Sequence, residues 1–117
     1  MTIIVLPFPP SVNVLYAGRG RRYKSKRYVR WEIEARNALR SQPFTPLGKI
    51  PLQAHYRFGR PDARIRDICN FIKAPDDLMV HEGVIADDSW IHHYIVEWDD
   101  IEGVYIEITP LEARKAR

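Results

Sequence analysis

Continuous and alternating apolar stretches predict a set of β-strands along this chain. Residues 2–7 form an unbroken apolar run that ends in prolines, which favours a strand buried on both faces. Residues 52–58 and 104–109 alternate apolar with polar side chains, the pattern of a strand with one buried face. Residues 91–98 are also rich in strand-forming side chains. We therefore expect a sheet to which both ends of the chain contribute.

Two helices are predicted between these strands. Ser25 is a suitable N-cap for a helix that runs to about Arg40, and its apolar side chains recur along one face. A second, short helix should follow Asp67. Because Pro75 lacks a backbone donor, that helix must kink or begin again with the proline in its first turn, and we expect a boundary near Ala74.

Strands interleaved with two helices predict an α+β fold in which a mixed β-sheet packs against both helices. With 117 residues and 45% hydrophobic content, the chain can bury one core of its own, so residues 1–117 are expected to form a single domain. One cysteine excludes an internal disulfide, and no signal peptide or long apolar span is visible. We expect a cytoplasmic protein with no membrane association.

Basic residues gather between positions 19 and 36, with tyrosines among them. The Gly18-Arg19-Gly20 segment predicts a hairpin turn, and a cationic loop can reach phosphates while an aromatic ring stacks on an exposed base. A merely solvated hairpin remains the alternative. The predicted DNA contacts are Arg19, Arg21, Arg22, Lys24, Lys26 and Arg27, with Arg64 and Arg66 further along the chain.

Acidic residues lie on both sides of the second predicted helix. Four side chains would share one face if the helix were continuous: Asp67, Asn70, Lys73 and Asp77. Asp87 and Asp88 follow the helix. Carboxylates that converged beside a lysine would suit a metal-dependent phosphodiesterase site. The same spacing fits helix caps and turn residues, because sequence separation does not give distance in space.

Three motifs carry a family resemblance. The chain reads RDICNFIK at positions 66–73, GVIADDSWI at 83–91 and PFPPSVN at 7–13. The first two resemble the R-D-x-D-N-x-x-K element and the G-V/F-x-x-D-D-x-x-I element of the RusA family of Holliday junction resolvases, and the third resembles that family's P-x-P-P-S-x-N opening. The motifs are spaced about as they are in the family, and the resemblance covers essentially the whole chain.

The resemblance implies an endonuclease of DNA recombination and repair, encoded by a bacterium or phage. It would bind four-way DNA junctions as a homodimer and resolve them by paired nicking with Mg²⁺, or with Mn²⁺ as a possible substitute. The implied catalytic residues are Asp67, Lys73 and Asp88, and the implied metal ligands are Asp67, Asp88 and Asp87. Lys73 would stabilise charge that develops on the phosphate.

One position departs from the family pattern. Cys69 stands where the family has the second acid of its D-x-D pair, and a thiol is a poor ligand for magnesium. A catalytically weakened or inactive junction-binding protein is therefore the alternative to an active nuclease. A structural or regulatory protein unrelated to DNA also stays open if the basic region is only a solvated surface.

Overall fold

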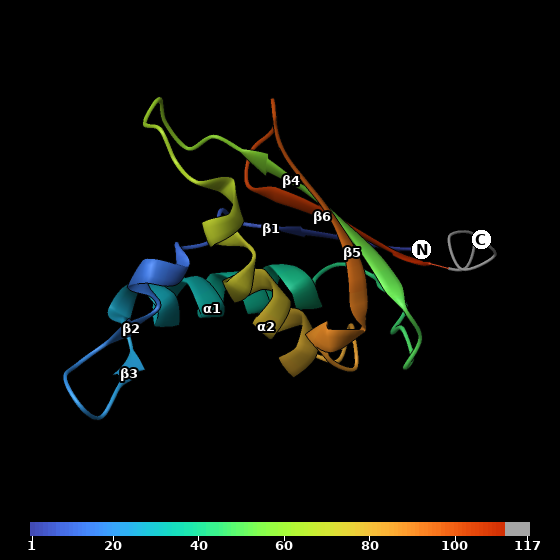
Figure 1. Ribbon diagram of the computed structural model, residues 1–117, viewed down its shortest axis with the longest axis horizontal. Helices are drawn as coiled ribbons and strands as arrows, with labels where there is room; N and C mark the ends of the chain where they lie inside the picture. Colours follow the sequence, from blue (N-terminus) through green and yellow to red (C-terminus); the bar gives the residue numbers. More distant parts are fainter. Residues whose placement is uncertain (112–117) are drawn as a thin grey trace.

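The computed structural model describes residues 1–111, in which a four-stranded sheet packs against two helices (Figure 1). The predicted α+β architecture with a mixed sheet is confirmed: the strand order is β1-β6-β4-β5, with β4 and β5 parallel and the other neighbours antiparallel. The sheet strands are β1 (Thr2–Leu6), β4 (Leu52–Gly59), β5 (Ile91–Asp99) and β6 (Val104–Pro110). Residues 112–117, whose sequence predicts a short basic tail, lie outside the described residues.

The helices are α1 (Lys26–Arg40) and α2 (Lys73–His81), and both lie on one side of the sheet in Figure 1. Ser25 caps α1 as predicted, because its hydroxyl accepts a hydrogen bond from the Tyr28 backbone N–H at 3.1 Å. A two-stranded hairpin, β2 (Tyr16–Ala17) and β3 (Tyr23–Lys24), precedes α1 and projects from the body of the molecule. No helix within residues 1–111 is both long and apolar enough to cross a membrane.

The core lies between the sheet and the helices. The inward residues of β4 and β6 are all fully buried, as their alternation predicted: Leu52, Ala54, Tyr56, Phe58, Val104, Ile106 and Ile108. A group of aromatic rings closes one end of this core, with Phe8 and Phe71 centroids 5.0 Å apart and Phe58 6.2 Å from Phe71. These contacts fix residues 7–13 and the motif at residues 66–73 against the sheet.

The prediction that residues 2–7 are buried on both faces is wrong. Ile4 is fully buried, but Val5 is 45% exposed, so the strand has one buried face. The reason is that both helices lie on one side of the sheet, so the outward face of β1 is left uncovered. The continuous apolar run therefore reflects strand propensity rather than burial on both faces.

The connection from β4 to β5 carries every predicted catalytic residue. Because the two strands are parallel, the chain between them must return along the length of the sheet. It does so through a loop, a 3₁₀ turn η2 (Ile68–Phe71), α2, and a second 3₁₀ turn η3 (Asp88–Trp90). A short turn η1 (Val12–Val14) lies near the start of the chain.

Asp67 and Asp77 do not share a helical face, contrary to the prediction. Asp67 precedes η2, and α2 begins only at Lys73, so the expected boundary near Ala74 is confirmed. Pro75 occupies the first turn of α2, where its missing N–H leaves no hydrogen bond unmade. Gly83, at φ +79°, ends the helix and turns the chain toward Asp87 and Asp88.

Candidate active site

Lys73 and Asp77 lie one turn apart on α2 and form an ion pair. The Lys73 ammonium is 3.1 Å from Asp77 Oδ1 and 3.0 Å from Oδ2. The hydrogen bond to Asp77 raises the pKa of Lys73, with Asp88 as a further negative charge nearby, so the ammonium stays protonated at neutral pH. The helix thus presents a fixed cation beside acidic groups.

Asp87 and Asp88 reach the same place from the start of η3. Together with Lys73, Asp77 and His81 they line a surface pocket of about 450 Å³, which we call the acidic pocket. Asp87 caps η3, because its carboxylate accepts a hydrogen bond from the Ser89 backbone N–H at 3.0 Å. Hydrogen bonds from Ser89 lower the pKa of Asp87, so this carboxylate is ionised at neutral pH.

Asp67 is placed differently from the other predicted ligands. It caps η2, accepting a hydrogen bond from the Cys69 backbone N–H at 3.1 Å, and it lines a second cleft rather than the acidic pocket. Asp67 and Asp87 therefore both cap short 3₁₀ turns, which is the alternative to metal binding that the sequence left open. Lys73, Asp87 and Asp88 are brought together, while the role of Asp67 stays a prediction.

The donor set fits a hard divalent ion without forming a complete cage. Among residues 1–111 no three His, Cys, Asp or Glu side chains are grouped so that they could hold a metal by themselves. Magnesium is commonly bound through one or two carboxylates, with waters and substrate phosphates completing its shell. The adjacent carboxylates of Asp87 and Asp88 are donors of this kind.

Asp76 is a buried acid that the sequence did not reveal as special. It is only 4% exposed, and its carboxylate accepts hydrogen bonds from the hydroxyls of Tyr56 in β4 and Tyr94 in β5. Burial raises the pKa of Asp76 to about 6, although the two tyrosine hydrogen bonds act in the opposite direction. Its burial could be suspected from the sequence only because Asp76 and Asp77 are neighbours on a predicted helix, so their side chains must point in different directions.

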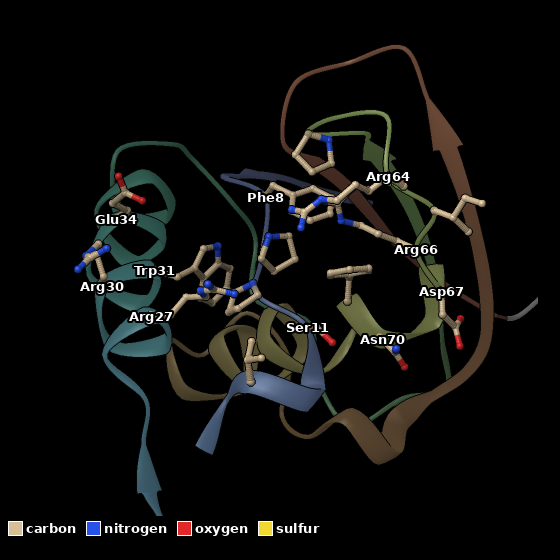
Figure 2. A pocket seen from close by; sticks show the side chains of 16 residues that line it. Phe8, Ser11, Arg27, Arg30, Trp31, Glu34, Arg64, Arg66, Asp67 and Asn70 are labelled. Atoms are coloured by element: carbon tan, nitrogen blue, oxygen red, sulfur yellow. Dashed lines mark hydrogen bonds between the residues drawn. The ribbon is translucent and has the colours of Figure 1, made fainter. Parts of the chain in front are cut away.

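Four arginines line a cleft of about 610 Å³ between α1 and the loop that follows β4 (Figure 2). We call it the arginine cleft: Arg27 and Arg30 come from α1, and Arg64 and Arg66 come from the loop. Its apolar walls include Phe8, Trp31 and Phe71. Three of the predicted DNA contacts thus meet in one cleft, and Arg30 joins them although it was absent from the predicted set.

Asp62 holds the two loop arginines in place. Its carboxylate accepts hydrogen bonds from Arg66 Nη1 and Nη2 at 2.6 and 2.9 Å, and from the Arg64 backbone N–H at 2.9 Å. These bonds, with that of Arg66 foremost, hold the pKa of Asp62 well below its usual range. A bidentate contact of this type fixes the planar guanidinium group of Arg66 before any ligand arrives.

The cations of the β2–β3 hairpin lie outside this cleft. Arg19, Arg21 and Arg22 are exposed around the predicted turn, and the Arg22 guanidinium lies 6.0 Å from the Tyr16 ring centroid. Lys24 instead forms a salt bridge with Glu32 at 2.9 Å. Lys26, at the first position of α1, is also exposed. The hairpin therefore offers separate positive charge on a projecting arm (Figure 1).

Comparisons with known proteins show which family the chain is similar to. A family model described as endodeoxyribonuclease RusA matches residues 7–109. A crossover junction endodeoxyribonuclease of Enterobacteria phage HK97 is 30% identical over 98 residues, which are 83% of this chain and 76% of the phage protein. A RusA protein of Aquifex aeolicus is 31% identical over 111 residues, covering 92% of this chain and 88% of that protein. The Escherichia coli K12 protein is 28% identical, covering 93% and 92% of the two chains.

The acidic pocket with its paired lysine offers donors for a divalent ion, the arginine cleft offers cations for a polyanionic backbone, and the family model that matches the chain describes an endodeoxyribonuclease. The chain belongs to the RusA family. Membership confirms the resemblance and the enzyme class predicted from the sequence.

Proposed function

We propose that the chain is a magnesium-dependent endonuclease that binds four-way DNA junctions as a homodimer and nicks two opposed strands. The observation that carries this proposal is the layout of the β4–β5 connection. It brings Lys73, Asp77, Asp87 and Asp88 to one pocket and carries two arginines to the arginine cleft. The RusA proteins of phage HK97 and Aquifex aeolicus, which the chain resembles, are named for cutting crossover junctions.

The ligands of the metal would be Asp67 and Asp88, joined by Asp87. Because Asp67 lines the arginine cleft and the other two line the acidic pocket, this ligand set requires the Asp67 carboxylate to approach Asp88 when the ion binds. When bound, a magnesium ion supplies Lewis acidity and lowers the pKa of a coordinated water. Manganese could take its place with the same oxygen donors. The carboxylates of this chain would orient the ion against the phosphate that the arginines hold.

Lys73 would stabilise the negative charge that builds up on the phosphate oxygens during cleavage. Its ammonium is held by Asp77 and is protonated at neutral pH, so it is a permanent charge that needs no reorganisation. A phosphate arriving in the acidic pocket would share this ammonium with Asp77. The ion pair therefore keeps Lys73 oriented in the free protein.

The arginines would fix the DNA backbone without reading its sequence. Guanidinium groups bind phosphates in a bidentate manner, and Arg66 is already oriented by Asp62. Arg27 and Arg30 approach the same cleft from α1, so a backbone in the cleft would be held from two sides. The exposed hairpin arginines would add contacts to a second stretch of the junction.

A homodimer follows from the symmetry of the substrate. A four-way junction has two strands to be cut in equivalent positions, and a two-fold dimer would present two equal sites to them. Light scattering of the purified protein, which measures its mass in solution, tests this part directly. A monomer at the concentrations that support paired nicking would contradict it.

A binding-only protein is the second candidate, and Cys69 favours it. The thiol is exposed in η2, and the backbone N–H of Cys69 donates a hydrogen bond to the Asp67 carboxylate. Three nearby acids that could replace the missing carboxylate are already engaged: Asp62 with arginines, Asp76 with tyrosines and Asp77 with Lys73. Such a protein would bind junctions and fail to cut them.

The test compares a labelled four-way junction with a linear duplex made from the same arm sequences. Binding is measured in EDTA, and nicking is measured after magnesium is added. Selective binding followed by symmetric nicks supports the nuclease. Selective binding with no nicks at any magnesium concentration supports the binding-only protein, and equal affinity for both DNAs contradicts both candidates.

A further inference from the structure

Ile65 is fully exposed at the edge of the arginine cleft. Its relative exposure is 100%, whereas the next most exposed large apolar side chains are Met1 at 72% and Tyr23 at 63%. Single exposed apolar residues are ordinary on protein surfaces. This one is unusual because nothing in the described chain shields any part of it and because an arginine stands on each side, Arg64 and Arg66.

The loop that carries Ile65 is braced. Asp62 binds the backbone of Arg64 and the guanidinium groups of both Arg64 and Arg66, so the residues before and after Ile65 share one anchor. A β-branched side chain also has few rotamers. The isoleucine is therefore presented at a defined position, and little further ordering would be needed when a ligand binds it.

The position of Ile65 along the chain places it close to the predicted site of cleavage. It lies two residues before Asp67, and two residues of extended chain span at most about 7 Å. Successive nucleotides of one strand are about 3.4 Å apart along a duplex. DNA whose scissile phosphate lies at Asp67 would therefore have Ile65 within about two base steps.

An apolar tip between two cations fits an exposed base-pair face bordered by phosphates. A continuous duplex offers only phosphates and groove edges to such a tip, since its bases are stacked on one another. The branch point of a four-way junction interrupts the stack, and apolar side chains are known to pack against or between base steps in distorted DNA.

We propose that Ile65 packs against the base pair at the branch point, while Arg64 and Arg66 hold the flanking phosphates. This inference rests on the proposed function and adds to it the contact that distinguishes a junction from a duplex. It also explains why an isoleucine stands exposed in a loop whose other long side chains are cationic.

The test uses Ile65→Ala and a junction that carries 2-aminopurine, a fluorescent base that brightens when it unstacks, at the branch point. Binding is measured in EDTA. The parent should raise the fluorescence, and Ile65→Ala should lose most of this rise together with about tenfold in junction affinity, since the apolar contact with the unstacked base pair is lost. Affinity for linear duplex should stay within about twofold, because the phosphate contacts remain.

Two controls keep the outcome clear. Ile33→Ala removes a side chain that is 52% exposed on α1 and should behave as the parent does. Ile65→Leu should recover the fluorescence rise. If the parent selects and nicks junctions while Ile65→Ala matches it in both affinity and fluorescence, the branch-point contact is wrong and the proposed function stands. If the parent fails to select junctions over duplex, the proposed function itself is wrong.

Discussion

Asp76 of α2 accepts a hydrogen bond from the hydroxyl of Tyr94 in β5, so a buried carboxylate joins the helix that carries Lys73 to the strand that begins just after Asp88. Tyr56 of β4 donates to the other carboxylate oxygen. One acid therefore holds α2 against two neighbouring strands. The relative placement of Lys73 and Asp88, which the proposed chemistry requires, depends on this contact.

The burial of Asp76 predicts a pH-dependent stability. Its pKa is about 6 in the folded protein against 3.8 without the fold. Since folding raises the pKa of Asp76, this group contributes most to the stability of the fold below about pH 4, and that contribution is lost as the pH rises through about 6. The loss should approach about 3 kcal/mol in the free energy of unfolding, at about 1.4 kcal/mol per pKa unit.

Asp76→Asn should remove this dependence. Urea unfolding followed by tryptophan fluorescence at pH 4 and pH 7 gives the difference between variant and parent at each pH, which cancels the other titrating groups. The free energy of unfolding of the variant, relative to that of the parent, should increase as the pH rises. Asp100→Asn, in the exposed turn after β5, is the matched control and should show no such gain. A constant difference between Asp76→Asn and the parent would show that Asp76 does not titrate in this range.

Asp67→Asn and Asp88→Asn should each abolish nicking, by at least about a hundredfold, while junction binding in EDTA stays equal or becomes tighter. A carboxylate that holds the metal also repels the DNA backbone, so its neutralisation removes cleavage and one source of repulsion together. Nicking and binding are measured on the same labelled junction, with Asp100→Asn as the control. Nicking at the parent rate in either variant would remove that residue from the site.

The exposed hairpin should contribute to the salt dependence of junction binding. Each phosphate that a protein neutralises adds about −0.9 to the slope of log K against log[salt] for B-form DNA. Arg21→Ala combined with Arg22→Ala should therefore flatten the slope by up to about 2. Lys49→Ala, an exposed cation in the loop before β4, is the control. A slope identical to that of the parent would exclude the hairpin from the interface.

Cys69→Asp should restore a hard oxygen ligand and lower the magnesium concentration needed for nicking. Groups that only orient a metal ligand change metal affinity by about 10–100-fold. Adding a ligand should therefore lower the magnesium concentration needed for nicking by at least about tenfold. Any residual activity of the parent should be higher with manganese than with magnesium, because manganese tolerates softer donors better.

A magnesium titration of the nicking rate for the parent, Cys69→Asp and Cys69→Asn decides this point. The asparagine variant controls for size without adding charge. If the parent already nicks at low magnesium and the aspartate variant does no better, another acid completes the site, and the added carboxylate would bring only like-charge repulsion. Asp77, which lines the acidic pocket, would then be the first candidate.

The sequence predicted those helices and strands that depend on patterns within a few neighbouring residues. The alternation in residues 52–58 and 104–109 located β4 and β6, and Ser25 located the start of α1. The two-sided burial of residues 2–7 failed because the helices cover only one face of the sheet, which no local pattern contains. The shared face of Asp67 and Asp77 failed because a 3₁₀ turn interrupts the helix.

The candidate site was predictable only where residues are close in sequence. Lys73 and Asp77 are four apart on a helix, so their ion pair could be expected. The contact of Asp76 with Tyr94 depends on the packing of separate elements, in particular on the parallel pairing of β4 with β5, and so does the cleft that Arg30 and Arg66 both line. Spacing along the chain carries no information about either.

The position of β5 at the edge of the sheet bears on how the protein would lose activity. This strand pairs only with β4. Residues 60–90 connect the two strands and hold the acidic pocket and one wall of the arginine cleft, so both sites depend on this pairing. Edge elements open locally at a lower free energy than the whole fold. Mild heating or low denaturant should therefore inactivate the protein by releasing this strand while the central strands β6 and β4 and the helix α1 stay folded.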